Sequence, residues 1–156
     1  MSSAYTLVLC GTDGSESSLR AVDRAAAVAR DAGALLLLVT AYRPMSTRDT
    51  QQAQDALGDD AYKVAGATPA EDVLRDAANR ASRVGAVKVE TLAVEGDPVD
   101  GLTEIANARH ADLVVVGNRG LNSLAGRLLG SVPANISHRS PCDVLIVHTT
   151  GRGPKT

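Results

Sequence analysis

The sequence has almost no aromatic residues: its 156 positions include three tyrosines, no phenylalanine and no tryptophan. Proteins that hold single-stranded nucleic acid stack the bases on aromatic side chains, and proteins that grip the phosphate backbone need clustered Lys and Arg. The formal net charge of this chain is −2. The composition therefore argues against a nucleic-acid partner, and the core must be built from Ala, Val, Leu and Ile.

Cysteines and long apolar runs are also scarce. Two cysteines allow neither a disulfide framework nor a cysteine-rich metal site, and both Cys10 and Cys142 have neighbours typical of buried or edge positions. The longest apolar stretch, residues 34–39, is far shorter than the roughly 20 residues that cross a bilayer. The first residues lack the regions of a signal peptide. These features predict a cytoplasmic protein with no membrane partner and no metal.

Five β-like runs alternate with helical patterns along the chain. Four of them are nearly continuously apolar, which is typical of strands covered on both faces of a parallel sheet. The third run alternates between apolar and polar residues, which suits a strand at the edge of a sheet. In chain order, the runs cover residues 5–11, 35–42, 87–94, 112–117 and 143–148.

The segments between these runs carry apolar residues at the helical spacing of three and four. Thr68, followed by Pro69 and Glu71, has the pattern of an N-cap, a first-turn proline and a capping box. Asp97 and Pro98 repeat the cap and the proline. This alternation predicts an α/β fold with a single open five-stranded parallel sheet and helices on both faces.

The chain is expected to form one domain over residues 1–150, followed by a solvated tail at residues 151–156. The polar segment 43–67 is too long for a simple connection between a strand and a helix. It could form a partly helical lid or a disordered insertion.

Glycines follow the first and fourth strands, at the edge where open parallel sheets bind ligands. Residues 11–15 come after the first strand, and residues 117–120 come after the fourth. Glycines allow backbone N–H groups to approach a ligand closely. Ser131 then precedes a predicted final helix at 132–139, whose N-terminus attracts anions. The arrangement predicts an anion-binding loop, although the same glycines could simply form a tight connection.

The spacing Gly117-x2-Gly120-x9-Gly130-Ser131 resembles the nucleotide-binding motif of the universal stress protein family. The resemblance extends over nearly the whole chain, through residues 13–15, 112–117 and 142–147. It implies a Rossmann-like sheet in strand order 3-2-1-4-5 and an adenine nucleotide as the ligand. In that order the third strand lies at an edge, in agreement with its alternating pattern.

The resemblance also implies a position for each part of the nucleotide. Asp13, with Gly11 and Thr12 beside it, would face the adenine. Ala41, late in the second strand, would line the base pocket. The residues that would flank the ribose and hold the phosphates are Val116, Gly117, Arg119, Gly120, Gly130, Ser131 and Val132.

Two departures from the family pattern bear on the identity of the ligand. Pro133 stands where ATP-binding members commonly have a small hydroxyl residue, and proline supplies neither a hydroxyl nor an N–H. Gly11 is smaller than the residue often found there, so we expect extra room beside the base. Both departures favour a ligand with less charge than ATP. In this respect the sequence resembles the mycobacterial-type members of the family that bind cyclic AMP.

The sequence predicts a binding protein, a sensor or a sink for a second messenger, rather than an enzyme. Phosphoryl transfer needs a positioned metal ion, and no second carboxylate can be placed beside Asp13. His110, His138 and His148 all fall outside the glycine-containing loop. One alternative is an ATP-binding member, with or without magnesium, that has slow ATPase or autophosphorylation activity. Another is a dimeric scaffold without a ligand.

The last predicted strand would lie at a sheet edge with no charge to block pairing. Unprotected apolar edges usually pair with another chain, and many relatives form dimers in this way. We expect a homodimer, although the tail could instead cover the edge. The residues concerned are Val144, Leu145, Ile146 and Val147.

Overall fold

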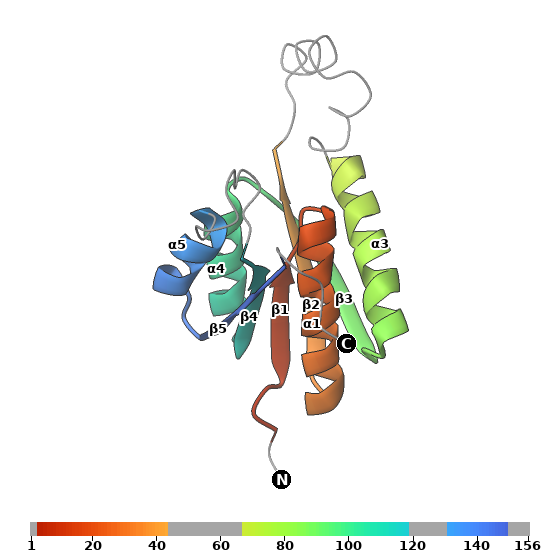
Figure 1. The fold of residues 1–156 in the computed structure, drawn as a ribbon. Coiled ribbons are helices and arrows are strands. Elements are labelled where there is room, and N and C mark those ends of the chain that lie inside the picture. The colour runs from red at the N-terminus through yellow and green to blue at the C-terminus, as the bar shows by residue number, and fades with distance from the viewer. Residues whose placement is uncertain (1–2, 44–66, 119–130, 150–156) are drawn as a thin grey trace.

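Five parallel strands form one sheet in the order β3-β2-β1-β4-β5 (Figure 1). The computed structural model describes residues 3–43, 67–118 and 131–149. The predicted fold class and strand order are confirmed, and so is the edge position of the third strand. The predicted runs differ from the observed strands by at most two residues at any end. The strands are β1 (Leu7–Gly11), β2 (Leu35–Tyr42), β3 (Lys88–Glu95), β4 (Leu113–Gly117) and β5 (Asp143–Val147).

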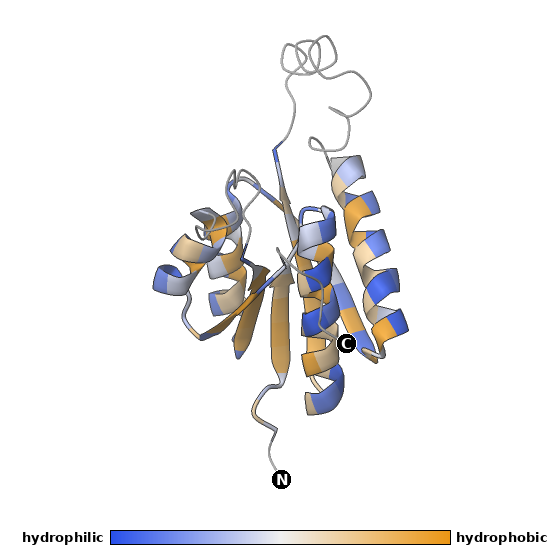
Figure 2. Cartoon of the chain, in the orientation of Figure 1, coloured by the Kyte–Doolittle hydropathy of each residue, from blue (hydrophilic) through white to orange (hydrophobic). Residues whose placement is uncertain are grey.

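Helices cover both faces of this sheet. α1 (Glu16–Ala32) and α3 (Ala67–Val84) lie on one face, and α4 (Pro98–Arg109) and α5 (Ser131–Arg139) lie on the other. Figure 2 shows that apolar residues dominate the central strands, whereas the outer faces of α1 and α3 are largely hydrophilic. Strands covered on both faces must be apolar along their whole length, which explains why the central runs do not alternate.

In the part of the chain that the structure describes, none of the buried core residues is aromatic. The largest fully buried side chains are leucines on β1 and β2, together with Ile136 on α5. Small side chains let the helices approach the sheet closely, so an interior without aromatic residues can still pack densely. Alanines on α1 and α3 are buried against the sheet, and these are Ala21, Ala25, Ala26, Ala29, Ala77 and Ala81.

The start of α4 agrees with its predicted cap, and the start of α3 does not. The Ser15 side chain caps α1 by accepting the Ser18 N–H at 3.1 Å, and Asp97 caps α4 in the same way. The predicted cap at Thr68 is wrong, because α3 begins at Ala67 and therefore includes Thr68. Pro69 remains within the first turn, where a helix does not require an N–H donor. α5 begins at Ser131, one residue before the predicted start.

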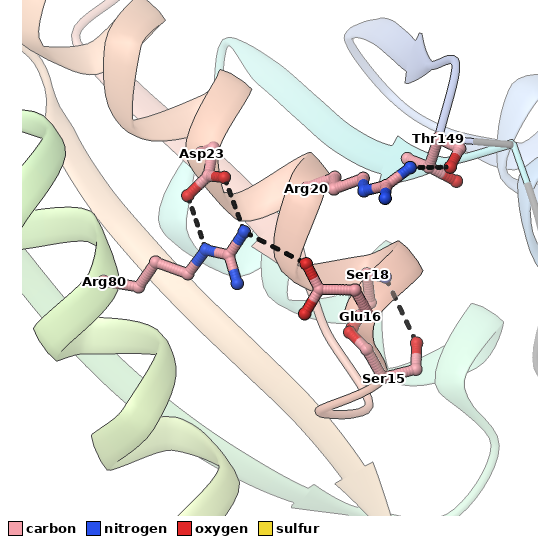
Figure 3. Close-up of polar contacts among 7 residues, drawn as sticks. All are labelled: Ser15, Glu16, Ser18, Arg20, Asp23, Arg80 and Thr149. Carbon is pink, nitrogen blue, oxygen red and sulfur yellow. Dashed lines mark hydrogen bonds and ion pairs between the residues drawn. The ribbon is translucent and has the colours of Figure 1, made fainter. Parts of the chain in front are cut away.

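An ion pair joins the two helices on one face of the sheet (Figure 3). Arg80 of α3 contacts both carboxylate oxygens of Asp23 on α1, with distances of 2.7 Å from Nε to Oδ1 and 2.8 Å from Nη2 to Oδ2. A longer contact of 3.5 Å connects Arg80 to Glu16. This paired geometry fixes the separation of α1 and α3 more strictly than a single contact would.

Two of the predicted segments fall outside the described residues. These are most of the proposed lid at residues 43–67 and the whole tail at residues 151–156. Within residues 3–43, 67–118 and 131–149, no helix combines the length and the apolar character needed to cross a membrane.

Asp112 ties the start of β4 to the start of β1. Its Oδ2 atom accepts the Thr6 hydroxyl at 2.6 Å, the Thr6 N–H at 2.7 Å and the Leu7 N–H at 2.8 Å. The hydrogen bond from the Thr6 side chain, followed by those from the two backbone groups, lowers the pKa of Asp112. The carboxylate therefore secures the amino end of the central strand.

We expect the substitution Asp112→Asn to destabilise the protein in a pH-dependent manner. A carboxylate whose pKa is lowered by folding contributes stability above its unfolded value of about 3.9 and loses it as the pH falls through the folded value. Urea unfolding followed by circular dichroism should show a deficit in the free energy of unfolding at pH 7. That deficit should shrink below about pH 4. The exposed Asp31→Asn variant is the control, and a deficit independent of pH would contradict this role.

Candidate functional site at the carboxyl ends of β1 and β4

The strand order reverses between β1 and β4. From β1 the chain crosses to β2 on one side, whereas β4 pairs with β1 on the other side, with Cys10 opposite Val115. Open parallel sheets bind ligands at the carboxyl ends of the strands where the strand order reverses. Of the predicted site residues, Gly11, Thr12, Asp13, Val116 and Gly117 are brought together at this edge.

The loop after β1 is held by its own side chains. The Thr12 N–H donates to the Val39 carbonyl at 2.9 Å, and the Thr12 hydroxyl lies 2.8 Å from the Ser18 hydroxyl. Asp13 accepts the Ser15 N–H on Oδ1 at 2.9 Å. Gly14 has a φ of +83°, a backbone conformation that residues with a side chain rarely adopt. This turn holds the Asp13 carboxylate in one orientation just beyond the carboxyl end of β1.

Ala41 lies near the carboxyl end of β2, beyond the level at which Gly11 pairs with Val39. Its side chain is half-buried, and Val94 of β3 lies opposite it in the register. The small side chain is thus at the same edge of the sheet as Asp13, one strand away from β1. This is compatible with the predicted position beside the base.

The predicted phosphate-binding residues Ser131 and Val132 lie in the first turn of α5, a helix on the other face of the sheet. Ser131 is exposed, Val132 is half-buried and Pro133 is fully buried. The first N–H groups of a helix have no acceptor within it, and Pro133 has no N–H to offer. The turn therefore has one donor fewer than an ordinary helix start. Arg119, Gly120 and Gly130, also predicted for the site, lie outside the described residues.

The expected free space beside Gly11 does not exist. A Cβ atom added to Gly11 would lie 2.9 Å from Cδ1 of Leu102 on α4 and 3.4 Å from its Cδ2. Leu102 is 4% exposed and packs in the core between the sheet and the α4 and α5 helices. The missing side chain of Gly11 thus makes room for Leu102 and not for a ligand.

Three polar residues near Gly117 escaped sequence reasoning: Ser17, Asn118 and Thr149. Asn118 Oδ1 accepts both the N–H and the hydroxyl of Thr149 at 2.9 Å, and the Thr149 hydroxyl also contacts the hydroxyl of Ser17. A signal was present, because Asn118 and Thr149 each lie within two residues of the end of a strand. The parallel pairing of β4 and β5 brings such residues together.

The cysteines occupy the structural positions that their neighbours predicted. Cys10 is completely buried in β1, and burial raises the pKa of its thiol to about 12. A thiol with that pKa remains protonated and unreactive at neutral pH. In the part of the chain that the structure describes, no group of three His, Cys, Asp or Glu residues could hold a metal ion.

Residues 4–148 match the sequence model of the universal stress protein family. The chain belongs to this family. It is 53% identical over 148 residues to the universal stress protein Rv1636 of Mycobacterium tuberculosis, an alignment that covers 95% of this chain and 99% of that protein.

Solved structures extend the comparison from sequence to fold. A universal stress protein crystallised in complex with cAMP is 54% identical and superposes with a TM-score of 0.76, covering 95% of this chain and 100% of the other. The universal stress protein UspA from Lactobacillus plantarum is 23% identical and has a TM-score of 0.73, with coverage of 92% and 97%. The second comparison shows the shared fold alone.

The contact between Gly11 and Leu102 predicts that Gly11→Ala destabilises the protein by about 1–3 kcal/mol, the usual cost of overpacking a core. Gly117→Ala is the matched control at the end of the neighbouring strand, because its Cβ would meet Thr149 Cγ2 at an ordinary 3.4 Å. Shortening the partner by Leu102→Val should reduce the added cost of Gly11→Ala in the double variant. Equal unfolding midpoints for both glycine variants in urea would contradict the contact.

Proposed function

We propose that this universal stress protein binds an adenine nucleotide, with a preference for cyclic AMP, and acts as a sensor or a sink for this second messenger. The observation that carries the proposal is the convergence of Asp13 and Gly117 at the reversal of strand order. It occurs in a chain whose 54% identical relative was solved in complex with cAMP. The proposed site residues are those of the sequence-based prediction, including Arg119, Gly120 and Gly130.

Asp13 is the proposed partner of the base. Because its Oδ1 atom accepts the Ser15 N–H, the carboxylate is held in a defined direction just beyond the carboxyl end of β1. An ionised carboxylate only accepts hydrogen bonds, and the exocyclic amino group of adenine donates them. Ala41, whose side chain is small and half-buried, is the proposed border of the base.

The start of α5 is the proposed partner of the phosphate. A cyclic phosphodiester carries a single negative charge, which matches a helix start that offers a partial positive charge and a reduced set of N–H donors. ATP carries more charge and makes greater demands on the same turn. The position of Pro133 in that turn therefore supports the cyclic nucleotide over the triphosphate.

We propose binding without catalysis as the principal activity. Asp13 is the carboxylate nearest to the reversal of strand order in the described residues, and its interaction with Ser15 makes it a part of the turn rather than a base for activating water. The alternative is a slow ATPase. Tighter binding of ATP with magnesium in the titration described below would favour it.

The decisive experiment is calorimetric titration of nucleotide-stripped protein with cyclic AMP, and with ATP in the presence and absence of magnesium. We expect cyclic AMP to bind more tightly than either form of ATP. The Asp13→Asn variant keeps an oxygen for the Ser15 N–H but loses the charge that faces the base. It should weaken binding of cyclic AMP about tenfold, since hydrogen bonds to charged groups contribute about 1.5–3 kcal/mol.

The Asp31→Asn variant, altered at the far end of α1, is the control and should bind as the wild type does. Tighter binding of ATP with magnesium would replace the cyclic nucleotide by ATP in this proposal. Binding of no nucleotide by the wild type would overturn it and leave a scaffold of the same fold.

We also propose that the protein forms a homodimer through β5. This strand pairs with β4 alone in the described part of the chain, and Val144, Leu145 and Ile146 are only half-buried within one protomer. The four residues from Val144 to Val147 carry no charge. An apolar edge with unpaired backbone groups favours addition of a strand from a second copy.

Size-exclusion chromatography with light scattering at micromolar concentration should therefore give the mass of a dimer. Leu145→Lys places a charge in the edge strand and should shift the mass toward that of a monomer. Thr91→Lys places the same charge in β3 at the opposite edge, where the side chain is already exposed, and should leave the dimer intact. A wild-type monomer, or dissociation by both variants alike, would contradict the β5 interface.

A further inference from the structure

A polar cluster at the carboxyl end of β4 consists of Ser17, Asn118 and Thr149. We name it the β4 exit cluster. Ser17 lies in the first turn of α1, Asn118 directly follows β4, and Thr149 lies two residues beyond the end of β5. The cluster therefore joins three elements that are distant in the sequence. Gly117 lies against it, because a Cβ there would be 3.4 Å from Thr149 Cγ2 and 3.8 Å from the Ser17 carbonyl oxygen.

The hydrogen bonds of this cluster can be satisfied in one direction only. The Thr149 N–H must donate, so the atom of Asn118 that it meets at 2.9 Å is the amide oxygen. The Thr149 hydroxyl donates to the same oxygen at 2.9 Å, which uses its single proton. Its contact with Ser17 must then be one in which the Ser17 hydroxyl donates. The chain of donors runs from Ser17 through Thr149 to Asn118.

Thr149 is itself fixed from every side. Its side chain is 5% exposed, its N–H and hydroxyl are engaged by Asn118, and its carbonyl accepts a hydrogen bond from Arg20 Nη1 at 2.9 Å (Figure 3). Its methyl group faces Gly117. Threonine is the residue that supplies both a hydroxyl for Asn118 and a methyl for the surface of Gly117, so serine and valine each preserve half of its contacts.

The cluster determines how the backbone leaves β4. The Asn118 N–H donates to the Val147 carbonyl at 2.8 Å, so this group is occupied by β5 and is not a donor for a ligand. Asn118 is thus held to the segment around β5 through its backbone N–H and through its side-chain oxygen. The motif residues Arg119 and Gly120 follow it directly in the sequence.

We propose that Thr149 is a positioning residue for nucleotide binding, which acts through Asn118 by fixing the point where the glycine motif leaves the sheet. This inference rests on the proposed function. A pre-organised anchor spares the ligand the cost of ordering the backbone on binding. The phosphate, which is the part of the nucleotide assigned to the glycine motif, depends on this anchor more than the base does.

The test is calorimetric titration of wild type, Thr149→Val and Thr149→Ser with cyclic AMP and with adenosine, which lacks the phosphate. Thr149→Val keeps the methyl shape and loses the donor to Asn118. We expect it to weaken cyclic AMP about three- to tenfold, the effect of one ordinary hydrogen bond, while the affinity for adenosine changes less than twofold. Thr149→Ser keeps the hydroxyl and should bind cyclic AMP within about twofold of the wild type.

A matched control and a second readout separate positioning from general stability. Thr103→Val removes a comparable hydroxyl, which donates to the Val99 carbonyl at 2.7 Å within α4, and should leave both affinities unchanged. Amide hydrogen exchange on the ligand-free protein should be faster at residues 118 and 149 in Thr149→Val, with unchanged exchange in β1 and β2.

The outcomes distinguish this inference from the proposed function. If the wild type binds no nucleotide, the proposed function fails and the inference fails with it. If the wild type binds cyclic AMP and Thr149→Val binds it equally well, the inference alone is overturned. Equal losses for cyclic AMP and adenosine, or faster exchange throughout the sheet, would show that Thr149 supports the fold and does not position the phosphate segment.

Discussion

The parallel pairing of β1 with β4 is the contact on which the rest of the structure depends. It places the central strand between two neighbours that are far apart in the sequence, β2 and β4, and so reverses the order of the strands. It also brings Asp13 and Gly117 to one edge of the sheet. At the amino ends of the same two strands, the pairing is secured by the three hydrogen bonds that Asp112 accepts from Thr6 and Leu7. The proposed nucleotide site and the hydrogen bonds of Asp112 thus lie at the two ends of one strand pair.

Much of the fold could be predicted from the sequence because its signals are local. Strands buried on both faces are apolar throughout, and all five were identified within two residues. The cap at Asp97 was found because a short polar side chain accepts an N–H only a few residues ahead. Thr68 failed as a cap because proline is accepted at several positions in a first turn, so the pattern did not determine where α3 begins.

The site could be predicted only in outline, because its details depend on contacts between distant residues. The positions of Asp13 and Gly117 follow from the strand order. The prediction of free space beside Gly11 was wrong. A small residue does not reveal which neighbour occupies the space beside it, and here that neighbour is Leu102. The β4 exit cluster depends on the register that pairs Gly117 with Val147. That register is set by tertiary packing, so the positions of Asn118 and Thr149 just beyond two strands did not by themselves show that the two side chains meet.

The central place of β1 has a consequence for synthesis on the ribosome. β1, α1 and β2 are adjacent in the sequence and can associate early, but the second edge of β1 finds its partner only when residues 113–117 have emerged. Until then, the backbone groups of Leu7 and Leu9, which face β4 in the finished sheet, have no partner on this apolar strand. The nascent chain therefore carries an unpaired, aggregation-prone strand edge through most of its translation. When β4 pairs with β1, the proposed nucleotide site is assembled and the free side of β1 is covered at the same time.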